Sequence, residues 1–283
     1  MDAKGWKYYN HAAIPTTPLH EDPDLTPIND GAIWSIEGGP LLARWTTDFD
    51  CGHETNWWYV IKDTPFDLSA IKANYRYKIN KGCKAFDCRR INPIEHVEAL
   101  YKVFLAAYSS WPKKYRPDFS YADAERMCNK LSQNTSIICY GAFYKKTQEL
   151  CGFMQVPVQD TYVELQVQRV NPEFEKFQIN AALVHYLLED HKEKLAQDSF
   201  YILDGARSIN HETAFQDYLE KYFGFRKAYC KLHIAYNPKI KWLVKLLYPL
   251  RRLLLKLDSV GIIHKINAVM KMEEIHCKEV QSS

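Results

Sequence analysis

The chain has 283 residues, of which 47% are hydrophobic and 25% are charged, and its formal net charge at pH 7 is +3. These values predict one large or two modest folded domains and exclude an intrinsically disordered chain. The hydrophilic start MDAKGWKYYNH does not resemble a signal peptide and the eight cysteines form no CxxC pair, so we expect reduced thiols in a cytoplasm.

Residues 1–84 are predicted to hold mostly short strands. The Pro-, Asp- and Thr-rich stretch 14–31 indicates an extended strap on the surface. After it, β-rich runs at 32–36, 41–47 and 57–61 predict a small antiparallel sheet. Asp67 then precedes a helix that we expect to end near Lys81.

From residue 85 the predicted elements follow the order βααβββαβαβ. Asn92 followed by Pro93 and Glu95 is typical of a helix start, and the apolar residues after it recur at helical spacing. The other predicted helices cover 121–131, 177–190 and 211–222. The predicted strands cover 85–91, 137–143, 150–157, 161–170, 199–204 and 227–236.

This order of elements, together with ELQVQRVNPEFEKFQINAAL at 164–183 and EKYFGF at 220–225, resembles the GNAT superfamily of N-acyltransferases. The segment RYKINKGCK at 76–84 is similar to a basic segment of Fem-type GNAT-like proteins, many of which act on cell-wall or surface-glycan precursors. The resemblance implies an α+β fold over 85–237, with a mixed, mostly antiparallel sheet flanked by helices. Residues 1–84 would then be a β-rich extension with a basic helix, equivalent to a partial first GNAT-like domain, and 238–283 an amphipathic helical tail.

The turn after the predicted strand 161–170 is where a typical GNAT protein holds the pyrophosphate of coenzyme A. Glycines let backbone N–H groups approach the phosphates there, and the helix N-terminus favours their charge. The family pattern is matched at Pro172, Glu173, Phe174 and Ile179. Lys176, Gln178 and Asn180 replace its glycines, so a side chain at 178 or 180 would fill part of the phosphate space, while Lys176 could contact a phosphate.

Three interpretations of this turn stay open. It could be an altered donor site, for instance for the aminoacyl-tRNA that Fem-type proteins use. It could bind acyl-CoA despite the replaced glycines. It could also be a purely structural turn.

The resemblance also implies catalytic residues. Glu164 stands where several GNAT proteins carry a glutamate that removes a proton from the acceptor amine. Backbone N–H groups near Arg169 and Val170 would stabilise the oxyanion. Tyr218 or Tyr222, in the helix before the Gly-Phe turn, would protonate the leaving group. The alternatives are an exposed carboxylate on the sheet and ordinary ring packing.

Three further residues are candidates for contact with the acceptor. Gln166 lies two residues after Glu164 and would share its face of the strand. Asp204 and Arg207 follow the strand 199–204, at the sheet edge where acceptors often bind. Arg207 could hold a phosphate or carboxylate, or pair with Asp204.

The predicted basic helix carries a stripe of polar side chains. Lys72, Arg76, Asn80 and Lys84 recur at i, i+4 spacing, with Lys78 and Lys81 beside them. Such a stripe suits the diphosphate of a nucleotide-sugar, a lipid-linked precursor or tRNA. A solvated basic face is the alternative.

A second basic segment covers residues 239–257, KIKWLVKLLYPLRRLLLKL. It contains six Lys/Arg and no acid, which leaves 31 basic against 34 acidic residues in the rest of the chain. Charges interrupt it too often for a transmembrane span, which needs about 20 apolar residues. The pattern is typical of a helix in the plane of an anionic membrane surface, kinked at Pro249. The alternative is a helix that packs on the protein's own core.

Metal ligation is not indicated. Cys51, His53, Cys83 and Cys88 could in principle supply ligands, but their spacing matches no zinc pattern. Small buried side chains are the more common role of such cysteines, and we expect no metal.

The leading hypothesis is a cytoplasmic N-acyltransferase at the inner face of the membrane. It would transfer an acyl or aminoacyl group, from acyl-CoA or aminoacyl-tRNA, to an amine of a small-molecule or lipid-linked sugar or cell-surface precursor. Attack would be direct, with both substrates bound. The alternative is a non-catalytic GNAT-like scaffold that recruits partners at the membrane surface. The sequence does not indicate an oligomeric state.

Overall fold

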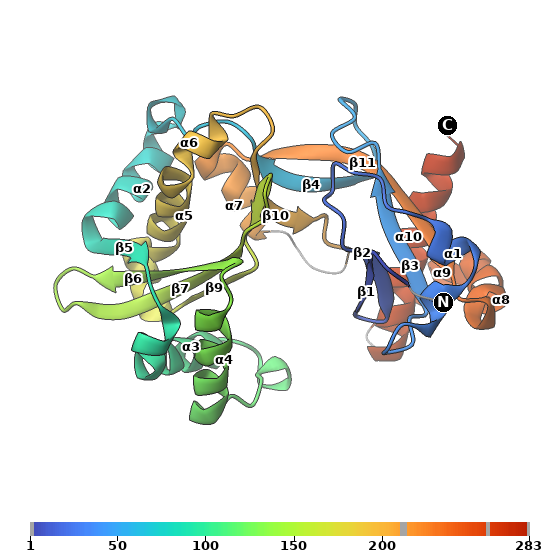
Figure 1. Cartoon of the computed structure of the whole chain (residues 1–283), viewed down its shortest axis with the longest axis horizontal. Helices are drawn as coiled ribbons and strands as arrows, with labels where there is room; N and C mark the ends of the chain where they lie inside the picture. Colours follow the sequence, from blue (N-terminus) through green and yellow to red (C-terminus); the bar gives the residue numbers. More distant parts are fainter. Residues whose placement is uncertain (1–2, 210–213, 259–260, 282–283) are drawn as a thin grey trace. The chain divides into compact units, whose positions relative to one another are not determined.

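The computed structural model describes residues 3–209, 214–258 and 261–281. Contacts group the chain into two compact units (Figure 1). The terminal unit comprises Met1–Tyr59, Ala206–Thr213 and Lys227–Ser283, and the central unit comprises Val60–Gly205 and Ala214–Arg226. This grouping differs from the predicted boundaries after 84 and 237, because helix 73–85 packs within the central unit and strand 226–236 pairs mainly within the terminal unit.

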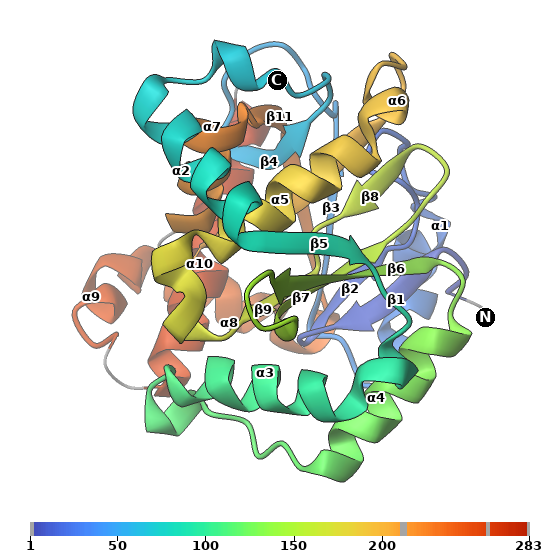
Figure 2. The same cartoon turned by 90° about the vertical axis from the view of Figure 1, so that its left-hand side faces the viewer.

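The central unit is built on a four-stranded antiparallel sheet. Its strands, in spatial order, are β5 (Phe86–Arg90), β6 (Ile137–Tyr144), β7 (Glu149–Pro157) and β9 (Val167–Val170). Helices α3 (Val97–Ser109) and α4 (Tyr121–Gln133) lie on one side of it, and α2 (Ala73–Ala85) and α5 (Ile179–Asp190) on the other (Figure 2). This α+β architecture confirms the predicted fold class.

Helix starts in this unit follow from local sequence. Ser120 and Asp123 form a capping box at the start of α4. Asn92 was expected to cap a helix directly, but residues Pro93–His96 form a 3-10 turn first, and the Asn92 amide donates to the Glu95 carboxylate instead. Of the apolar residues expected at helical spacing in α3, Leu100 and Phe104 are buried against the sheet, whereas Leu105 is exposed. Val103 and Ala107 are also buried.

Helix α2 packs closely against the start of α5. Ile79 and Gly82 are its buried residues, and a Cβ atom added at Gly82 would lie 2.5 Å from the Gln178 carbonyl oxygen. Glycine at 82 therefore allows the two helices to approach. The helix was expected to start after Asp67, but Leu68–Ala70 is a separate 3-10 turn that Asp67 caps.

The predicted strand 161–170 is in fact two strands. β8 (Tyr162–Glu164) pairs in parallel with β10 (Tyr201–Ala206), whereas β9 pairs antiparallel with β7. Val163 of β8 is also bridged to Val158, just after β7, so the two strands differ on their outer side, where only β8 is paired. The unit is completed by α6 (Lys192–Leu195) and by α7 (Ala214–Phe223). The predicted start of the latter helix, residues 211–213, lies outside the described residues.

The terminal unit contains a mixed sheet. Its strands are β1 (Trp6–Tyr9), β2 (Ala12–Pro15), β3 (Leu42–Thr47) and, from residue 231, β11 (Arg226–Tyr236). The pairs β1–β2 and β3–β11 are antiparallel, but β2 and β3 pair in parallel. The expected small antiparallel sheet is therefore a mixed sheet. β4 (Trp57–Lys62) is a strand as predicted and continues from this unit into the central one.

Two local predictions for this unit were wrong. Residues Ala32–Ser35 form a 3-10 turn instead of a strand, because Gly31 has a φ of 81° and the Asp30 carboxylate accepts from the Ala32 N–H. The expected strap contains a short helix, α1 (Thr26–Asn29), whose Ile28 packs on a buried cluster beneath it.

The tail is helical, as predicted. It comprises α8 (Pro238–Leu247), α9 (Arg251–Leu255) and α10 (Gly261–Gln281). A 3-10 turn around Pro249 separates the first two helices, and α10 packs Ile275 against the sheet. Among the described residues, no helix has the length and apolar character that crossing a membrane would require.

Candidate active site

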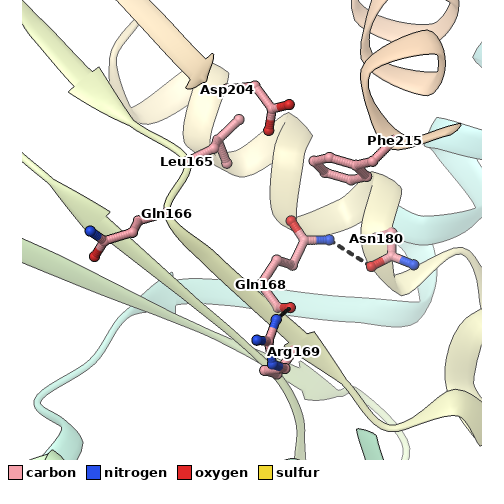
Figure 3. A pocket seen from close by; sticks show the side chains of 7 residues that line it. All are labelled: Leu165, Gln166, Gln168, Arg169, Asn180, Asp204 and Phe215. Carbon is pink, nitrogen blue, oxygen red and sulfur yellow. Dashed lines mark hydrogen bonds between the residues drawn. The ribbon is translucent and has the colours of Figure 1, made fainter. Parts of the chain in front are cut away.

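A pocket of about 330 Å³ opens in the central unit beside the junction of β8 and β9. β8 is paired with β10, but β9 is the edge strand of the four-stranded sheet and leaves its outer side open. The pocket is lined by residues of the β8–β9 junction, β9 and β10, and by the first residues of α5 and α7 (Figure 3). These residues are Leu165, Gln166, Gln168, Arg169, Asn180, Asp204 and Phe215.

A β-bulge lies between β8 and β9, because three residues separate Val163 from Val167 while two separate Val158 from Gln155 on the neighbouring strand. The Gln166 N–H donates to the Gln155 carbonyl at 3.3 Å, and Val167 lies opposite the same residue. The bulge interrupts the alternation of faces, so the period-2 argument that put Gln166 on the face of Glu164 does not hold. The Gln166 side chain is exposed, accepts from the Gln155 amide at 2.6 Å, and points away from Asp204 (Figure 3).

The outer edge of β9 offers backbone donors to the pocket. Asn171 N–H donates to the Cys151 carbonyl of β7 at 2.8 Å. Because backbone groups alternate in direction along a strand, the amide of Arg169 also faces β7, and the amides of Gln168 and Val170 face the open edge. Of the two positions expected near an oxyanion, Val170 has its amide on the open edge and Arg169 does not, and the amide of Gln168 shares that edge.

Arg169 contributes positive charge beside the pocket. Its guanidinium donates to the Gln168 carbonyl at 2.8 Å and lies 5.9 Å and 5.2 Å from the ring centroids of Tyr108 and Trp111. Its Nε atom is buried and has no hydrogen-bond partner in the described part of the chain. A buried donor of this kind suits a polar or anionic group of a ligand.

The turn before α5 keeps the backbone shape that its missing glycines would favour. Gln178 adopts φ 67° and ψ 41°, in the left-handed region, which costs a non-glycine residue about 1–2 kcal/mol. The Asn180 side chain accepts from the Gln168 amide at 2.6 Å, and this pair joins β9 to the first turn of α5 (Figure 3). The Gln168 Oε1 atom is buried without a hydrogen-bond partner among the described residues.

Other residues of the predicted donor loop do not reach the pocket. Lys176 is exposed, and its amine lies 5.2 Å from the ring centroid of Phe177. The side chains of Ile179 and Val170 are buried and pack around Gly152. The polar lining of this end of the pocket therefore comes from Gln168, Arg169 and Asn180.

Asp204 forms the opposite end of the pocket. Burial raises the pKa of its carboxyl to about 7, with a further contribution from the negative charge of Glu164, while a hydrogen bond from Gln216 opposes the rise. Glu164 lies opposite Leu203 in the β8–β10 pair and is not among the side chains that line the pocket. The geometry thus favours Asp204 over Glu164 as the carboxylate that meets a ligand.

Comparison with known proteins supports the fold. No protein-family model matches the chain, and no curated protein matches its sequence. Among solved structures, FemX matches over 78% of this chain and 78% of its own, with a TM-score of 0.52 and 9% sequence identity. The chain has a GNAT-like fold.

Two further solved structures are similar to parts of this chain or to most of it. The PaiA N-acetyltransferase from Thermoplasma acidophilum, in complex with coenzyme A, matches 39% of this chain and 74% of its own, with a TM-score of 0.32 and 21% identity. The structure named L-PGS from Bacillus licheniformis matches 82% of this chain and 79% of its own, with a TM-score of 0.49 and 17% identity.

The two predicted tyrosine acids lie on α7 of this GNAT-like fold. The Tyr222 hydroxyl accepts from the Lys78 amine at 2.8 Å, and its ring packs on Tyr75 and Tyr218. Burial and the neighbouring Tyr222 raise the pKa of Tyr218, so its hydroxyl stays protonated. Neither ring is part of the pocket lining, whereas Phe215 of the same helix is.

The remaining predicted substrate contacts lie elsewhere. Arg207 belongs to the terminal unit, where it donates to the Asn56 carbonyl at 2.6 Å and lies 4.5 Å from the Trp58 ring centroid, so the expected alternative of a pair with Asp204 is not what the structure has. On α2, Arg76 donates to the Ser69 carbonyl, and Lys81 and Lys84 are exposed. These cations do not line the pocket.

Sequence reasoning missed three lining residues, Leu165, Gln168 and Phe215. Gln168 carried a weak signal, since it is a polar residue between the apolar Val167 and Val170 in a predicted strand. Leu165 and Phe215 carried none.

No group of three or more His, Cys, Asp or Glu side chains suitable for a metal occurs among the described residues.

Proposed function

We propose that this protein is an N-acyltransferase that moves an acyl or aminoacyl group to an amine of a sugar or cell-surface precursor. The observation that carries the proposal is the pocket between β9 and β10. There, Gln168, whose backbone N–H faces away from β7, and Asp204 line one cavity. Acyl transfer to an amine needs both functions, a donor to an oxyanion and an acceptor for a proton.

The reaction would proceed by direct attack with both substrates bound. The donor's acyl group would lie along the open edge of β9, where backbone amides stabilise the negative charge that develops on its carbonyl oxygen. Asp204 would take a proton from the acceptor ammonium, because only the neutral amine has a lone pair for attack. A C–N bond then forms, the donor's C–S or C–O bond breaks, and the leaving sulfur or oxygen receives a proton.

The pKa of about 7 suits Asp204 to this role. A base is most effective when its pKa lies near the working pH, since it is then largely ionised and still basic enough to hold the proton. An ordinary exposed aspartate, with a pKa of about 3.9, would be a much weaker base. Glu164 would act mainly through its charge, which helps to raise the pKa of Asp204.

Two donor classes fit this pocket, acyl-CoA and aminoacyl-tRNA. The left-handed Gln178 preserves the turn that precedes the helix N-terminus, which supports binding of a donor phosphate or ribose there. The Gln168–Asn180 pair fills space that glycines would leave open, which favours a donor whose contacts differ from those of a typical GNAT protein. The acceptor would be a small molecule or a lipid-linked glycan precursor.

The test is calorimetric titration with acetyl-CoA, a long-chain acyl-CoA and an aminoacyl-tRNA, followed by a product assay with amine acceptors. We expect at least one donor to bind the native protein and Gln168→Trp, which fills the pocket, to abolish that binding. Glu125→Gln, on the exposed side of α4, serves as the matched surface control and should bind as the native protein does.

Failure of all donors to bind, in calorimetry and in thermal stabilisation, would overturn the proposal. Equal donor binding by the native protein and by Gln168→Trp would overturn the assignment of the pocket. In the first case a GNAT-like scaffold without catalysis becomes the better interpretation.

A further inference from the structure

The helices α8 and α9 expose an unusual amount of apolar surface. Half of the sixteen large hydrophobic side chains that are exposed among the described residues fall between 242 and 262. The exposed fractions of Trp242, Leu246 and Leu253 are 63%, 59% and 59%. Scattered single exposed leucines are normal on a protein surface, but a continuous group of them marks an interaction site.

Five of the exposed residues recur at helical spacing. Trp242 and Leu246 lie on α8, Leu250 in the 3-10 turn, Leu253 on α9 and Leu257 just after it, each three or four positions from the next. We call these five residues the α8–α9 face. Val244 is buried and Leu254 half-buried between them, while Leu243 and Leu255 are exposed beside the face.

The opposite side of α8 and α9 already makes contacts within the terminal unit. Among the described residues, Val244 is the buried one of α8, and α9 has none. The Asn267 amide of α10 donates to the Leu254 carbonyl at 3.1 Å, and the Arg251 guanidinium lies 3.9 Å from the Glu274 carboxylate. These contacts hold α9 against α10 (Figure 1), so the α8–α9 face is not needed for packing within this unit.

Positive charge runs beside the face. Lys241, Lys245, Arg252 and Lys256 each precede a residue of the face by one position, and all four are exposed. No acidic residue occurs between 238 and 257. An apolar stripe with cations along its flank complements a surface that is apolar below and anionic above, which is the boundary of a bilayer that contains acidic phospholipid.

We propose that the α8–α9 face docks in the plane of an anionic membrane. Trp242 and the leucines lie at the boundary between headgroups and acyl chains, and the flanking lysines and Arg252 contact lipid phosphate and carboxylate groups. This inference rests on the terminal unit alone and does not depend on the proposed transferase activity.

The test is co-sedimentation of the full chain with vesicles of phosphatidylcholine alone or with phosphatidylserine added. We expect binding to the mixed vesicles that weakens as salt rises. Leu246→Ser/Leu253→Ser should lose at least about tenfold in vesicle affinity, because each removed side chain takes buried apolar area with it. Lys241→Gln/Lys245→Gln should lose the preference for phosphatidylserine.

A matched control is the double variant Ile94→Ser/Leu105→Ser. Both residues are exposed large apolar side chains of the central unit, with exposed fractions of 38% and 40%. This variant should bind vesicles as the native chain does.

Three outcomes would overturn the proposal: no binding to the mixed vesicles, equal binding to both vesicle types at every salt concentration, or native affinity in Leu246→Ser/Leu253→Ser. A self-associating face is tested in parallel by sedimentation velocity. If Leu246→Ser/Leu253→Ser dissolves a dimer of the native chain while vesicles remain unbound, the face is an interface between copies.

Discussion

In most proteins polar side chains are exposed and large apolar side chains are buried. The pocket of the central unit buries polar groups, whereas the α8–α9 face of the terminal unit exposes apolar ones. The pocket holds a half-buried carboxyl, a buried arginine Nε and a buried carboxamide oxygen. The α8–α9 face leaves Trp242 and several leucines in water. Each arrangement costs free energy in the isolated chain. A ligand in the pocket and a membrane on the face would recover that cost, and this is why we assign function to these two places.

The largest effect that we expect is that of substituting Asp204 in the pocket. Asp204→Asn keeps the size of the side chain and removes its basicity, so kcat should fall about 100-fold or more, as for loss of a general base. Donor affinity should stay within about twofold. The native kcat/KM should rise with pH and level off above the pKa of about 7. Steady-state kinetics with the donor found by titration checks both statements, and a kcat within tenfold of native would return the role to Glu164.

Helix α2, the other basic helix, can be compared with α8 and α9. Helix α2 buries Ile79 and Gly82 against its neighbours and has no comparable row of exposed leucines, and Gly82→Ala would bring a methyl group within 2.5 Å of the Gln178 carbonyl oxygen. We expect this variant to lose roughly 1–3 kcal/mol of unfolding free energy through overpacking.

Urea denaturation measures this loss, and Gly261→Ala is the control. No atom of the described chain lies within 4 Å of a Cβ at Gly261, and alanine favours a helix, so stability should be unchanged or higher. Equal effects of the two substitutions would contradict the close approach of α2 and α5.

The buried charge of the pocket should also appear in the pH dependence of stability. The pKa of Asp204 is about 7 in the folded chain and, as for any aspartate, about 3.9 when unfolded. Between these values the folded state binds more protons, so stability falls as pH rises through this interval. A pKa difference of one unit corresponds to about 1.4 kcal/mol of unfolding free energy. Because the carboxyl is only half-buried, we expect a total loss of roughly 1–2 kcal/mol, which is less than the difference of about three units would give.

Urea denaturation of the native protein and of Asp204→Asn, at several pH values from about 4 to 8, measures this effect. The native protein should lose stability relative to the variant as pH rises. Parallel profiles would mean that the carboxyl remains well solvated.

The smallest expected effect concerns the α8–α9 face. Leu253→Ser should change the unfolding free energy by less than about 0.5 kcal/mol, because this side chain packs on little in the isolated chain. Ile79→Ala, at a fully buried position of α2, should cost roughly 2–5 kcal/mol. Thermal and urea unfolding compare the two. A large loss in Leu253→Ser would show that the face packs within the protein.

Local signals predicted much of the order of elements. The helical spacing after Asn92, the helix at 121–131 and the strands of 137–157 are each decided by residues close in the chain, so their positions were within a few residues of those observed. The strands β1 and β2 were missed. β1 pairs with β2, and β2 pairs with β3, whose residues lie about thirty positions further along the chain.

The candidate site was only partly predictable. Gln178 and Asn180 were recognised as replaced glycines, and Asp204 was placed at the sheet edge. The division of 161–170 was not predicted, because a bulge exists only when one residue, here Gln155, lies opposite two on the next strand. That division decides which carboxylate meets the pocket.

The sequence by itself determined most of the helices and strands of the central unit and the places where charge accumulates, since these properties depend largely on neighbouring residues. The two basic segments looked alike at that level. Tertiary structure alone decided that Ile79 of α2 is covered by the central unit while Leu246 of α8 stays exposed. It also decided the environment of Asp204. Burial and the distance between charges are set by residues far apart in the chain, and those two quantities control both the pKa of a carboxyl and the availability of an apolar face.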